Sequence, residues 1–556
     1  MTAPAEPRRR AVQTLAGAAL LITFVTLASR VVGFGRWLAQ ASFLGTGGVD
    51  QPFNSANLLP NVLFEVAAGG ALAGAVVPLV SGYLVRGDKE LASRTASALL
   101  GWTLAVLVPL GAIMALLAQP IAGALQLGSQ ESVDIATGFL RVFALQVPLY
   151  GIAVVLGGIL QAHKRFFWPA FAPLVSSLVV IGVYVVFDRL ADGNQQDLAA
   201  LSADALSWLA WGTTAGVAFL ALPLLVPAYR TGIRLRPTLR FPDGEGRRAA
   251  RLAFAGVGAL VAQQLSLLAI MWAANAVGDD ATWTIYLYAQ QVYLLPYAVL
   301  AFPIATSAFP RFSEHAAEHQ WDALRRLVAS TTRTLIVAVG GGVAALLAAA
   351  PLVESVFDTV ADGDAFGLAS VLTWMAPGLV GYALVLQLSR VLYALDAGRA
   401  AVIATAAGWA VVGVGAGLTV IALGAAPGTE LEIRAQVLAW LGAAGTAGMA
   451  VAGTGLMLAV RTRLGGSALR GVVRTLLVVG VGATGGALLG RWAVTAPGRH
   501  GSGASPTEVP FDLTWFVADV GRGLLAGLVA AVVVLAAVLA TDQSLRRRLT
   551  SRIARR

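Results

Sequence analysis

Charged and amide side chains interrupt two apolar stretches near the start of the chain. Arg30 and Arg36 lie within residues 13–43, and Asn57, Asn61 and Glu65 lie within residues 52–85. A charged side chain at the centre of a bilayer costs about 2.5–3.5 kcal/mol on insertion scales, so such residues need a functional or structural reason. Guanidinium groups form charge-assisted, bidentate hydrogen bonds with phosphate. The residue types therefore predict a hydrated site for a polar, anionic group.

The spacing of these residues predicts which of them share a helix face. Asn57, Asn61 and Glu65 are four positions apart, which places them on one face. Arg30 and Arg36 are separated by about 600° of helical rotation, so they border a cavity at different depths rather than on one stripe. Ser29 accompanies the first arginine. In the alternative interpretation, Glu65 forms an ion pair with Arg30 or Arg36 that only fixes helix packing.

Further polar residues are candidates for binding or for coupling to an ion. Asp50 lies just before the stretch 52–85, at its outer end, and Gln264, Gln290, Gln291 and Arg390 lie within other apolar stretches. Glu65 is also a coupling candidate, since an isolated acid within the membrane suits proton coupling. For Arg390 the alternative is snorkelling toward an interface, with the charge in water and the stem in lipid.

The elements that carry these residues are predicted to be transmembrane helices. The 556 residues are 57% hydrophobic and 12% charged, whereas soluble domains carry about 25% charged residues. A membrane-spanning helix needs about 20 apolar residues. Fourteen stretches qualify: 13–43, 52–85, 92–118, 134–162, 168–187, 206–228, 249–277, 283–310, 327–350, 365–395, 400–423, 434–460, 472–494 and 514–540.

The distribution of basic residues predicts the orientation of these helices. Cytoplasmic loops collect Lys and Arg. With the N-terminus inside, the inner segments hold 30 of the 39 basic residues, the outer loops hold four, and five lie within the stretches. This bias predicts a multi-pass protein of the cytoplasmic membrane with both termini in the cytoplasm. It also explains the net charge of +10 without nucleic-acid binding.

A weak internal repeat predicts two related halves. Leu58-Leu59-Pro60 recurs as Leu294-Leu295-Pro296, six predicted spans later. An even number of spans keeps both copies in the same orientation, so we expect two pseudo-symmetric six-helix lobes that enclose a cavity, plus two extra C-terminal helices. In the alternative interpretation, the Leu-Leu-Pro motif recurs by chance and the two halves are not related. The predicted parts are an N-tail (1–12), an N-lobe (13–228), a cytoplasmic linker (229–248), a C-lobe (249–460), two further spans (461–541) and a basic C-tail (542–556).

The sequence argues against several kinds of chemistry. There is no cysteine and there are four histidines, so thiol catalysis is excluded and a multi-histidine metal centre is not expected. His315, Glu318 and His319 match an inverted zinc-protease pattern in a short loop that offers no third ligand. Gly480, Gly482 and Gly485 match a dinucleotide fingerprint inside an apolar span, where glycine serves helix packing. We therefore expect a transporter rather than an enzyme, with no cofactor unless an ion couples transport.

Several motifs carry a resemblance to a known family. They are Ser29-Arg30-Val31-Val32-Gly33-Phe34-Gly35-Arg36, Asn57-Leu58-Leu59-Pro60-Asn61, Gly69-Gly70-Ala71-Leu72, Phe309-Pro310-Arg311 and Arg390-Val391-Leu392-Tyr393-Ala394. Over roughly residues 12–460 the chain resembles the MurJ/MviN lipid II flippases, in particular their actinobacterial branch. The resemblance implies an α-helical transporter of the multidrug/oligosaccharidyl-lipid/polysaccharide exporter superfamily.

The resemblance also implies a substrate and roles for particular residues. The substrate is lipid II, the undecaprenyl-pyrophosphate-linked peptidoglycan precursor, which moves to the outer leaflet by alternating access driven by membrane potential or an ion gradient. Arg30 and Arg36 match family arginines that bind pyrophosphate, and Asp50 matches a functional aspartate. The chain departs from the family at Phe64 or Glu65 and at Gln290 or Gln291, where other members have arginines. The four-arginine site is therefore not carried over whole.

Two other interpretations remain open at this level. The chain could export a polysaccharide-lipid or, coupled to a cation, a drug. It could also be a non-transporting scaffold that docks cell-wall synthesis or division proteins. Membrane lipids are expected partners in every case.

Overall fold

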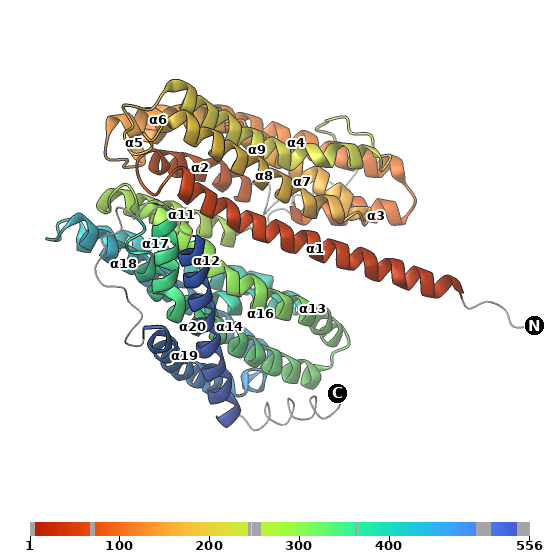
Figure 1. Ribbon diagram of the computed structural model, residues 1–556. Coiled ribbons are helices and arrows are strands. Elements are labelled where there is room, and N and C mark those ends of the chain that lie inside the picture. Colours follow the sequence, from red (N-terminus) through yellow and green to blue (C-terminus); the bar gives the residue numbers. More distant parts are fainter. Residues whose placement is uncertain are drawn as a thin grey trace, which may run out of the picture. The chain divides into compact units, whose positions relative to one another are not determined.

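The computed structural model describes residues 6–66, 73–242, 246, 257–361, 364–495 and 513–541. Throughout these residues the secondary structure is helical, joined by turns and short irregular segments, as predicted (Figure 1). Two compact units divide the chain at residues 257 and 258. Each unit is an independent bundle of packed helices, and they are described separately below.

Eleven helices in the described residues are long and apolar enough to cross a membrane. The number is twelve if Leu368–Met375 and Gly378–Ala394, which are bent by 48° relative to each other, form one span. The chain is thus a multi-pass membrane protein, but the predicted count of fourteen is not confirmed. The predicted stretches 13–43 and 52–85 are not among these spans; the described part of 52–85 includes helices of 15 and 13 residues, and residues 67–72 lie outside the described residues.

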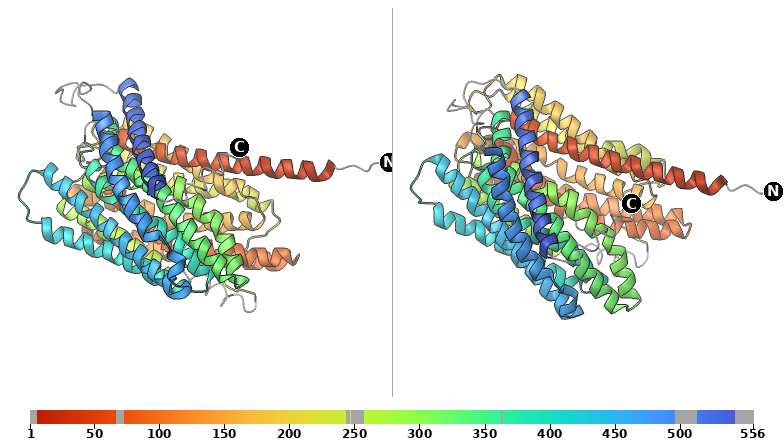
Figure 2. Two further views of the ribbon diagram at one scale, coloured as in Figure 1. Left: turned by 90° about the horizontal axis from the view of Figure 1, so that it is seen from below. Right: turned by 60° about the horizontal axis from the view of Figure 1, so that its bottom comes forward.

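The first unit is built around helix α7. Its helices are α1 (Glu6–Phe43), α2 (Asp50–Phe64), α3 (Ala73–Val85), α4 (Lys89–Leu116), α5 (Ala118–Ala124), α6 (Gln130–Phe143), α7 (Gln146–Ala162), α8 (Phe167–Ala191) and α9 (Ala203–Tyr229). α7 packs against α3, α4 and α9, and α1 lies along α8 (Figure 2). The apolar core between α3, α4 and α7 includes Val76, Leu99 and Ile159.

The predicted linker 229–248 is partly described and partly outside the described residues. Residues after α9 run along α4, where Thr238 N–H donates a 3.3 Å hydrogen bond to the Ser97 carbonyl and Arg236 N–H donates a 3.0 Å bond to the Ser97 hydroxyl. A β-carbon at Gly101 would lie 2.1 Å from the Thr238 carbonyl oxygen, so only glycine permits this close approach. The predicted C-tail 542–556 lies outside the described residues.

The second unit is centred on two long helices, α14 and α18. Its elements are α11 (Val257–Val277), α12 (Thr282–Pro296), the π-helix η2 (Tyr297–Ala301), α13 (Phe302–Ala317), α14 (Trp321–Val360), α15 (Leu368–Met375), α16 (Gly378–Ala394), α17 (Gly398–Leu423), α18 (Glu430–Leu464), η3 (Gly466–Leu469), α19 (Val472–Thr495) and α20 (Leu513–Thr541). α18 packs against α15, α16 and α17, while α14, α19 and α20 pack against one another.

One end of the second unit is held by a buried ionic cluster. The Arg434 guanidinium, on the first turns of α18, forms salt bridges with Asp279 and Asp364 at 2.5 Å each. Only 6% of the Arg434 side chain is exposed. The cluster therefore joins the start of α18 to the α11–α12 loop and to the segment before α15.

The two copies of the repeat share a backbone feature. Residues Glu65 and Val66, which follow Pro60, adopt π-helical geometry, and η2 follows Pro296 directly. The N–H that a proline lacks would bond the carbonyl four residues before it, so each proline weakens the turn before it, whereas the π-helical residues come after it. Each copy thus carries a local break in a polar helix.

Candidate functional site

The two predicted arginines lie on α1, but their surroundings differ. Arg30 is exposed and Arg36 is half-buried, with its Cζ atom 5.1 Å from the centroid of the Trp37 ring. Among the described residues, no ion pair joins either arginine to Glu65; the ion pairs that form involve other residues. The ion pair of Glu65 with Arg30 or Arg36, which the alternative interpretation required for helix packing, is therefore not formed in this structure.

Tyr150 on α7 brings three of the predicted residues together. Its hydroxyl donates a 2.9 Å hydrogen bond to Asn61 Oδ1, and its ring lies 4.5 Å from that of Phe64. Both Arg36 and Glu65 are close enough to act on this hydroxyl electrostatically. Asn61 of α2 therefore contacts this phenol, and the charges of Arg36 on α1 and Glu65 on the π-helical turn act on it.

The asparagines of α2 contribute differently to this cluster. Asn61 Nδ2 donates a 2.8 Å hydrogen bond to the backbone carbonyl of Asn57 one turn earlier, which fixes the amide so that its oxygen faces Tyr150. The Oδ1 atom of Asn57 is buried and accepts no hydrogen bond from the described residues. Buried polar atoms are normally satisfied, so an unmatched acceptor at this place is consistent with a polar ligand site.

Asp50 lies in a buried hydrogen-bond network rather than on an open surface. It accepts a 2.8 Å hydrogen bond from Gln40 Nε2 and a 2.9 Å bond from Asn54 Nδ2. Gln40 Nε2 also donates to Asn54 Oδ1 at 2.9 Å, and the Tyr184 hydroxyl donates to Gln40 Oε1 at 3.2 Å. All four side chains are buried, with exposures of 4% or less.

Tyr184 connects this network to Arg36. The charge of Arg36 and a side-chain hydrogen bond from it act on the Tyr184 hydroxyl, which also feels the charge of Asp50. Buried hydrogen-bond networks whose members are satisfied rigidify their surroundings. The arrangement therefore allows Asp50 to hold Arg36 in place through Gln40 and Tyr184.

The second unit contains a cavity of about 260 Å³ that includes Arg390. Its lining combines aromatic and polar side chains with apolar ones, and comprises Ala259, Gln263, Tyr297, Tyr382, Val385, Leu386, Ser389, Arg390, Tyr393, Ala401, Val402, Thr405 and Trp409. The rings of Tyr297 and Tyr382 are 4.7 Å apart, and those of Tyr382 and Trp409 are 6.4 Å apart in an edge-on arrangement. Such a site suits a ligand with both apolar faces and polar groups.

Arg390 is held at the edge of this cavity by α13. Its Nη1 atom donates a 2.9 Å hydrogen bond to the Thr306 hydroxyl, and its Cζ atom lies 5.6 Å from the Phe302 ring and 6.0 Å from the Phe309 ring. Cation–π contacts and one hydrogen bond orient the guanidinium.

The other polar residues predicted in the second unit do not join this cavity. Gln264 is buried, and its neighbour Gln263 lines the cavity instead. Gln290 and Gln291 are half-buried on α12 and are not among the lining residues.

Several residues of these clusters were not predicted from the sequence. They are Gln40, Asn54, Tyr150, Tyr184, Tyr382 and Trp409. A signal was present for some, because a tyrosine or glutamine in an apolar helix needs a hydrogen-bond partner when buried. Within the described residues no group of three or more His, Cys, Asp or Glu could hold a metal ion.

Comparisons with known proteins place the chain in a family. The family model described as "Lipid II flippase MurJ" matches residues 40–443. A protein of Rhizobium meliloti named probable lipid II flippase MurJ is 28% identical over 60% of this chain and 61% of its own length, slightly under two thirds. The lipid II flippase MurJ of Burkholderia cenocepacia is 28% identical over 68% of this chain and 73% of its own.

Solved structures show the same fold. The structure of a lipid II flippase MurJ in the inward closed conformation matches with a TM-score of 0.66 and 16% identity, covering 92% of this chain and 98% of the other. An inward-facing multidrug resistance MATE family transporter of the MOP superfamily matches with a TM-score of 0.60 and 17% identity, over 81% and 98% of the two chains.

Proposed function

Because the chain belongs to the MurJ lipid II flippase family, we propose that it moves lipid II from the inner to the outer leaflet of the cytoplasmic membrane. The observation that carries this proposal is the half-buried Arg36, which faces hydroxyl groups and has no carboxylate partner among the described residues. A guanidinium in that setting suits a pyrophosphate, which it can bind through two parallel hydrogen bonds.

In this proposal both arginines bind phosphate, Arg36 as the more buried residue and Arg30 as the more exposed one. Arg36 is close to Tyr150 and Tyr184, whereas Arg30 is exposed about 1.7 turns earlier on α1. The exposed arginine would meet the headgroup first. Ser29, Asn57, Asn61 and Tyr150 would supply neutral hydrogen bonds, and the buried acceptor Asn57 Oδ1 would receive one from the headgroup.

Asp50 would act as a positioning residue for Arg36. Its carboxylate is saturated by protein amides, so it does not need to touch the substrate. The chain of contacts through Gln40 and Tyr184 supports this role.

The cavity beside Arg390 is a separate candidate site for a polar ligand in the second unit. Aromatic faces with neighbouring hydroxyl and amide groups suit rings that carry hydroxyl substituents. Gln264, Gln290 and Gln291 would then support helix packing or coupling, since they do not line this cavity.

The membrane potential can supply the driving force without ATP. A pyrophosphate carries about two negative charges, and moving two charges outward at 100 mV, inside negative, is downhill by roughly 4–5 kcal/mol. Glu65, which is exposed beside the Tyr150 cluster, is a candidate for proton coupling. The basic loops support a topology with both termini in the cytoplasm.

The test is complementation of a strain depleted of its own lipid II flippase, combined with labelling of lipid II in the outer leaflet. Arg36→Gln should abolish growth and labelling, and Arg30→Gln should reduce labelling severalfold. Arg141→Gln, which changes an exposed arginine of α6 in the same unit, is the matched control and should leave both intact.

The same experiment separates the rival functions. Normal outer-leaflet labelling by both arginine variants would contradict the flippase proposal and favour a scaffold. Loss of drug efflux in Glu65→Gln with normal wall synthesis would favour a cation-coupled exporter.

A further inference from the structure

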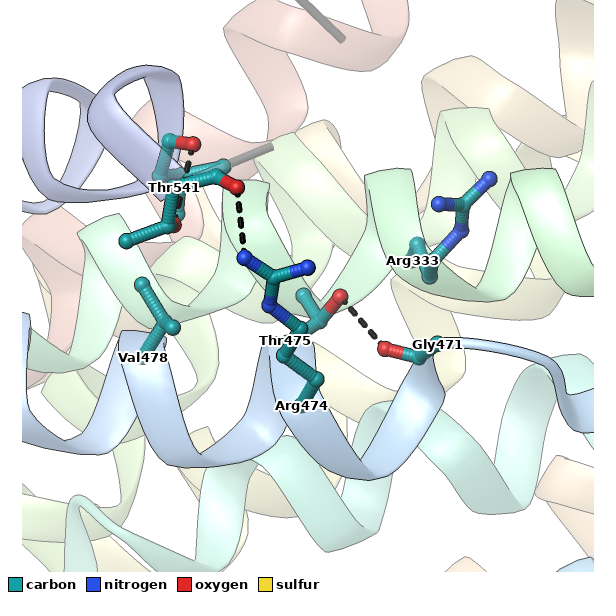
Figure 3. Close-up of a pocket in the computed structure, with 7 residues that line it drawn as sticks. Arg333, Gly471, Arg474, Thr475, Val478 and Thr541 are labelled. Atoms are coloured by element: carbon teal, nitrogen blue, oxygen red, sulfur yellow. Dashed lines mark hydrogen bonds between the residues drawn. The ribbon is translucent and has the colours of Figure 1, made fainter. Parts of the chain in front are cut away.

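A small cavity in the second unit lies apart from the residues of the proposed transport site. It has a volume of about 100 Å³ and lies where α14, α19 and α20 pack together. Figure 3 shows its lining, which comprises Arg333, Gly471, Arg474, Thr475, Val478, Val538 and Thr541. Two arginines thus line a space that is about the size of one phosphate group, and Nε of one of them, Arg333, donates a 3.3 Å hydrogen bond to the Ala329 carbonyl.

Arg474 is oriented by the end of α20. Its Nη2 atom donates a 2.7 Å hydrogen bond to the backbone carbonyl of Thr541 (Figure 3). A guanidinium carries five N–H donors in a rigid fork. The contact with Thr541 fixes the plane of the group and uses one of those donors.

Gly471 brings Arg333 against the start of α19. Its φ angle is +79°, and a β-carbon at this position would lie 3.2 Å from Arg333 Cδ. The first helical hydrogen bond of α19 runs from Thr475 N–H to the Gly471 carbonyl, at 2.9 Å. The N–H groups of the preceding turn add the positive end of a 24-residue helix to the two arginines.

The surroundings favour a lipid over a soluble ligand. The basic loops place this end of the unit at the cytoplasmic surface, in the orientation proposed above. On the stripe of α19 that contains Arg474, the side chains of Leu477, Val481 and Leu488 are 65–78% exposed. An acyl chain can lie along this apolar stripe while its headgroup phosphate reaches the cavity.

We propose that this cavity binds the phosphate group of an anionic phospholipid of the cytoplasmic leaflet. Arg474 donates hydrogen bonds to the phosphate, Arg333 adds positive charge beside Gly471, and Val478 and Val538 line the cavity with apolar side chains. The proposal depends on the orientation given above and not on transport activity. Asp542, which follows Thr541, lies outside the described residues.

The experiment uses the full-length protein, stripped of lipid in detergent and titrated with phosphatidylglycerol or phosphatidylcholine while bound lipid is counted by native mass spectrometry. Arg474→Gln should weaken phosphatidylglycerol binding by about tenfold, the loss expected for a charge-assisted hydrogen bond. Arg333→Gln should weaken it as well. Arg463→Gln, an exposed arginine near the end of α18, is the control and should bind like the wild type.

Three results would overturn the proposal. Phosphatidylcholine could bind as tightly as phosphatidylglycerol, or both pocket variants could bind like Arg463→Gln. Inorganic phosphate alone could bind with the same sensitivity to Arg474→Gln, which would assign the site to a soluble ligand. Arg474→Lys, which keeps the charge, should retain part of the binding and shows that any loss is not caused by misfolding.

Discussion

The Tyr184 hydroxyl donates a 3.2 Å hydrogen bond to Gln40 Oε1, across 144 positions of the sequence. The same hydroxyl is within reach of Arg36. This one phenol therefore joins the buried carboxylate of Asp50 to the arginine proposed to bind phosphate.

Removing that hydroxyl should separate activity from stability. Tyr184→Phe leaves the buried Gln40 Oε1 without this donor, which costs about 1–3 kcal/mol of folding stability. Arg36 also loses its orientation, so we expect outer-leaflet labelling of lipid II per folded protein to fall severalfold. Equal labelling by Tyr184→Phe and the wild type would contradict the positioning role.

Asp50 should matter for stability as well as for transport. Asp50→Ala leaves Gln40 Nε2 and Asn54 Nδ2 without their acceptor in a buried site. Each unmade bond costs about 1–3 kcal/mol, so the melting temperature should fall clearly. Asp188→Ala, which removes the acceptor of a 2.9 Å bond from Gln195 in a part-buried site, should have a smaller effect.

Tyr150 should affect transport more than folding. Tyr150→Phe removes the 2.9 Å bond to Asn61 but keeps the ring contact with Phe64. We expect weaker complementation of a flippase-depleted strain and nearly wild-type protein levels. Asn61→Ala should give a similar phenotype, and the double variant should be no worse than the more severe single variant, because both remove the same bond. Additive losses would show that the two residues act separately.

The buried cluster around Arg434 should be essential for the second unit. Arg434→Met removes the guanidinium that pairs with Asp279, whose side chain is 15% exposed, and breaking a buried pair in this way costs about 3–5 kcal/mol. The comparison is Arg94→Met, which breaks an exposed 3.2 Å pair with Glu90 and should cost about 0–1 kcal/mol. Thermal unfolding in detergent measures both. Similar melting temperatures for the two variants would refute the prediction.

Close packing of α16 on α18 should depend on a single glycine. A β-carbon at Gly381 would lie 2.2 Å from the Met449 carbonyl oxygen, so Gly381→Ala forces the helices apart. Overpacking of this kind costs about 1–3 kcal/mol. Gly445→Ala in α18 meets no atom within 4 Å and should be neutral or slightly stabilising. The melting temperatures of Gly381→Ala and Gly445→Ala, each compared with the wild type, test this prediction. Equal melting temperatures for the two variants would contradict it.

The sequence by itself determined the class of the protein and most of its helices. Apolar length is a local property, so twelve of the predicted stretches correspond to candidate spans when the bent pair Leu368–Met375 and Gly378–Ala394 is taken as one. The other two predicted stretches, 13–43 and 52–85, stay predictions, and residues 67–72 of the second lie outside the described residues.

Only the tertiary structure decided which polar residues meet. The four-residue spacing of Asn57, Asn61 and Glu65 predicted a shared face, but not that Tyr150, 89 positions after Asn61, would complete it. Helices in a membrane are apolar toward both the lipid and the bundle, so the hydrophobic pattern does not reveal which face meets a neighbour. The partners of Asp50, Arg36 and Arg434 follow from helix packing, and packing is set by contacts between residues that are distant along the chain.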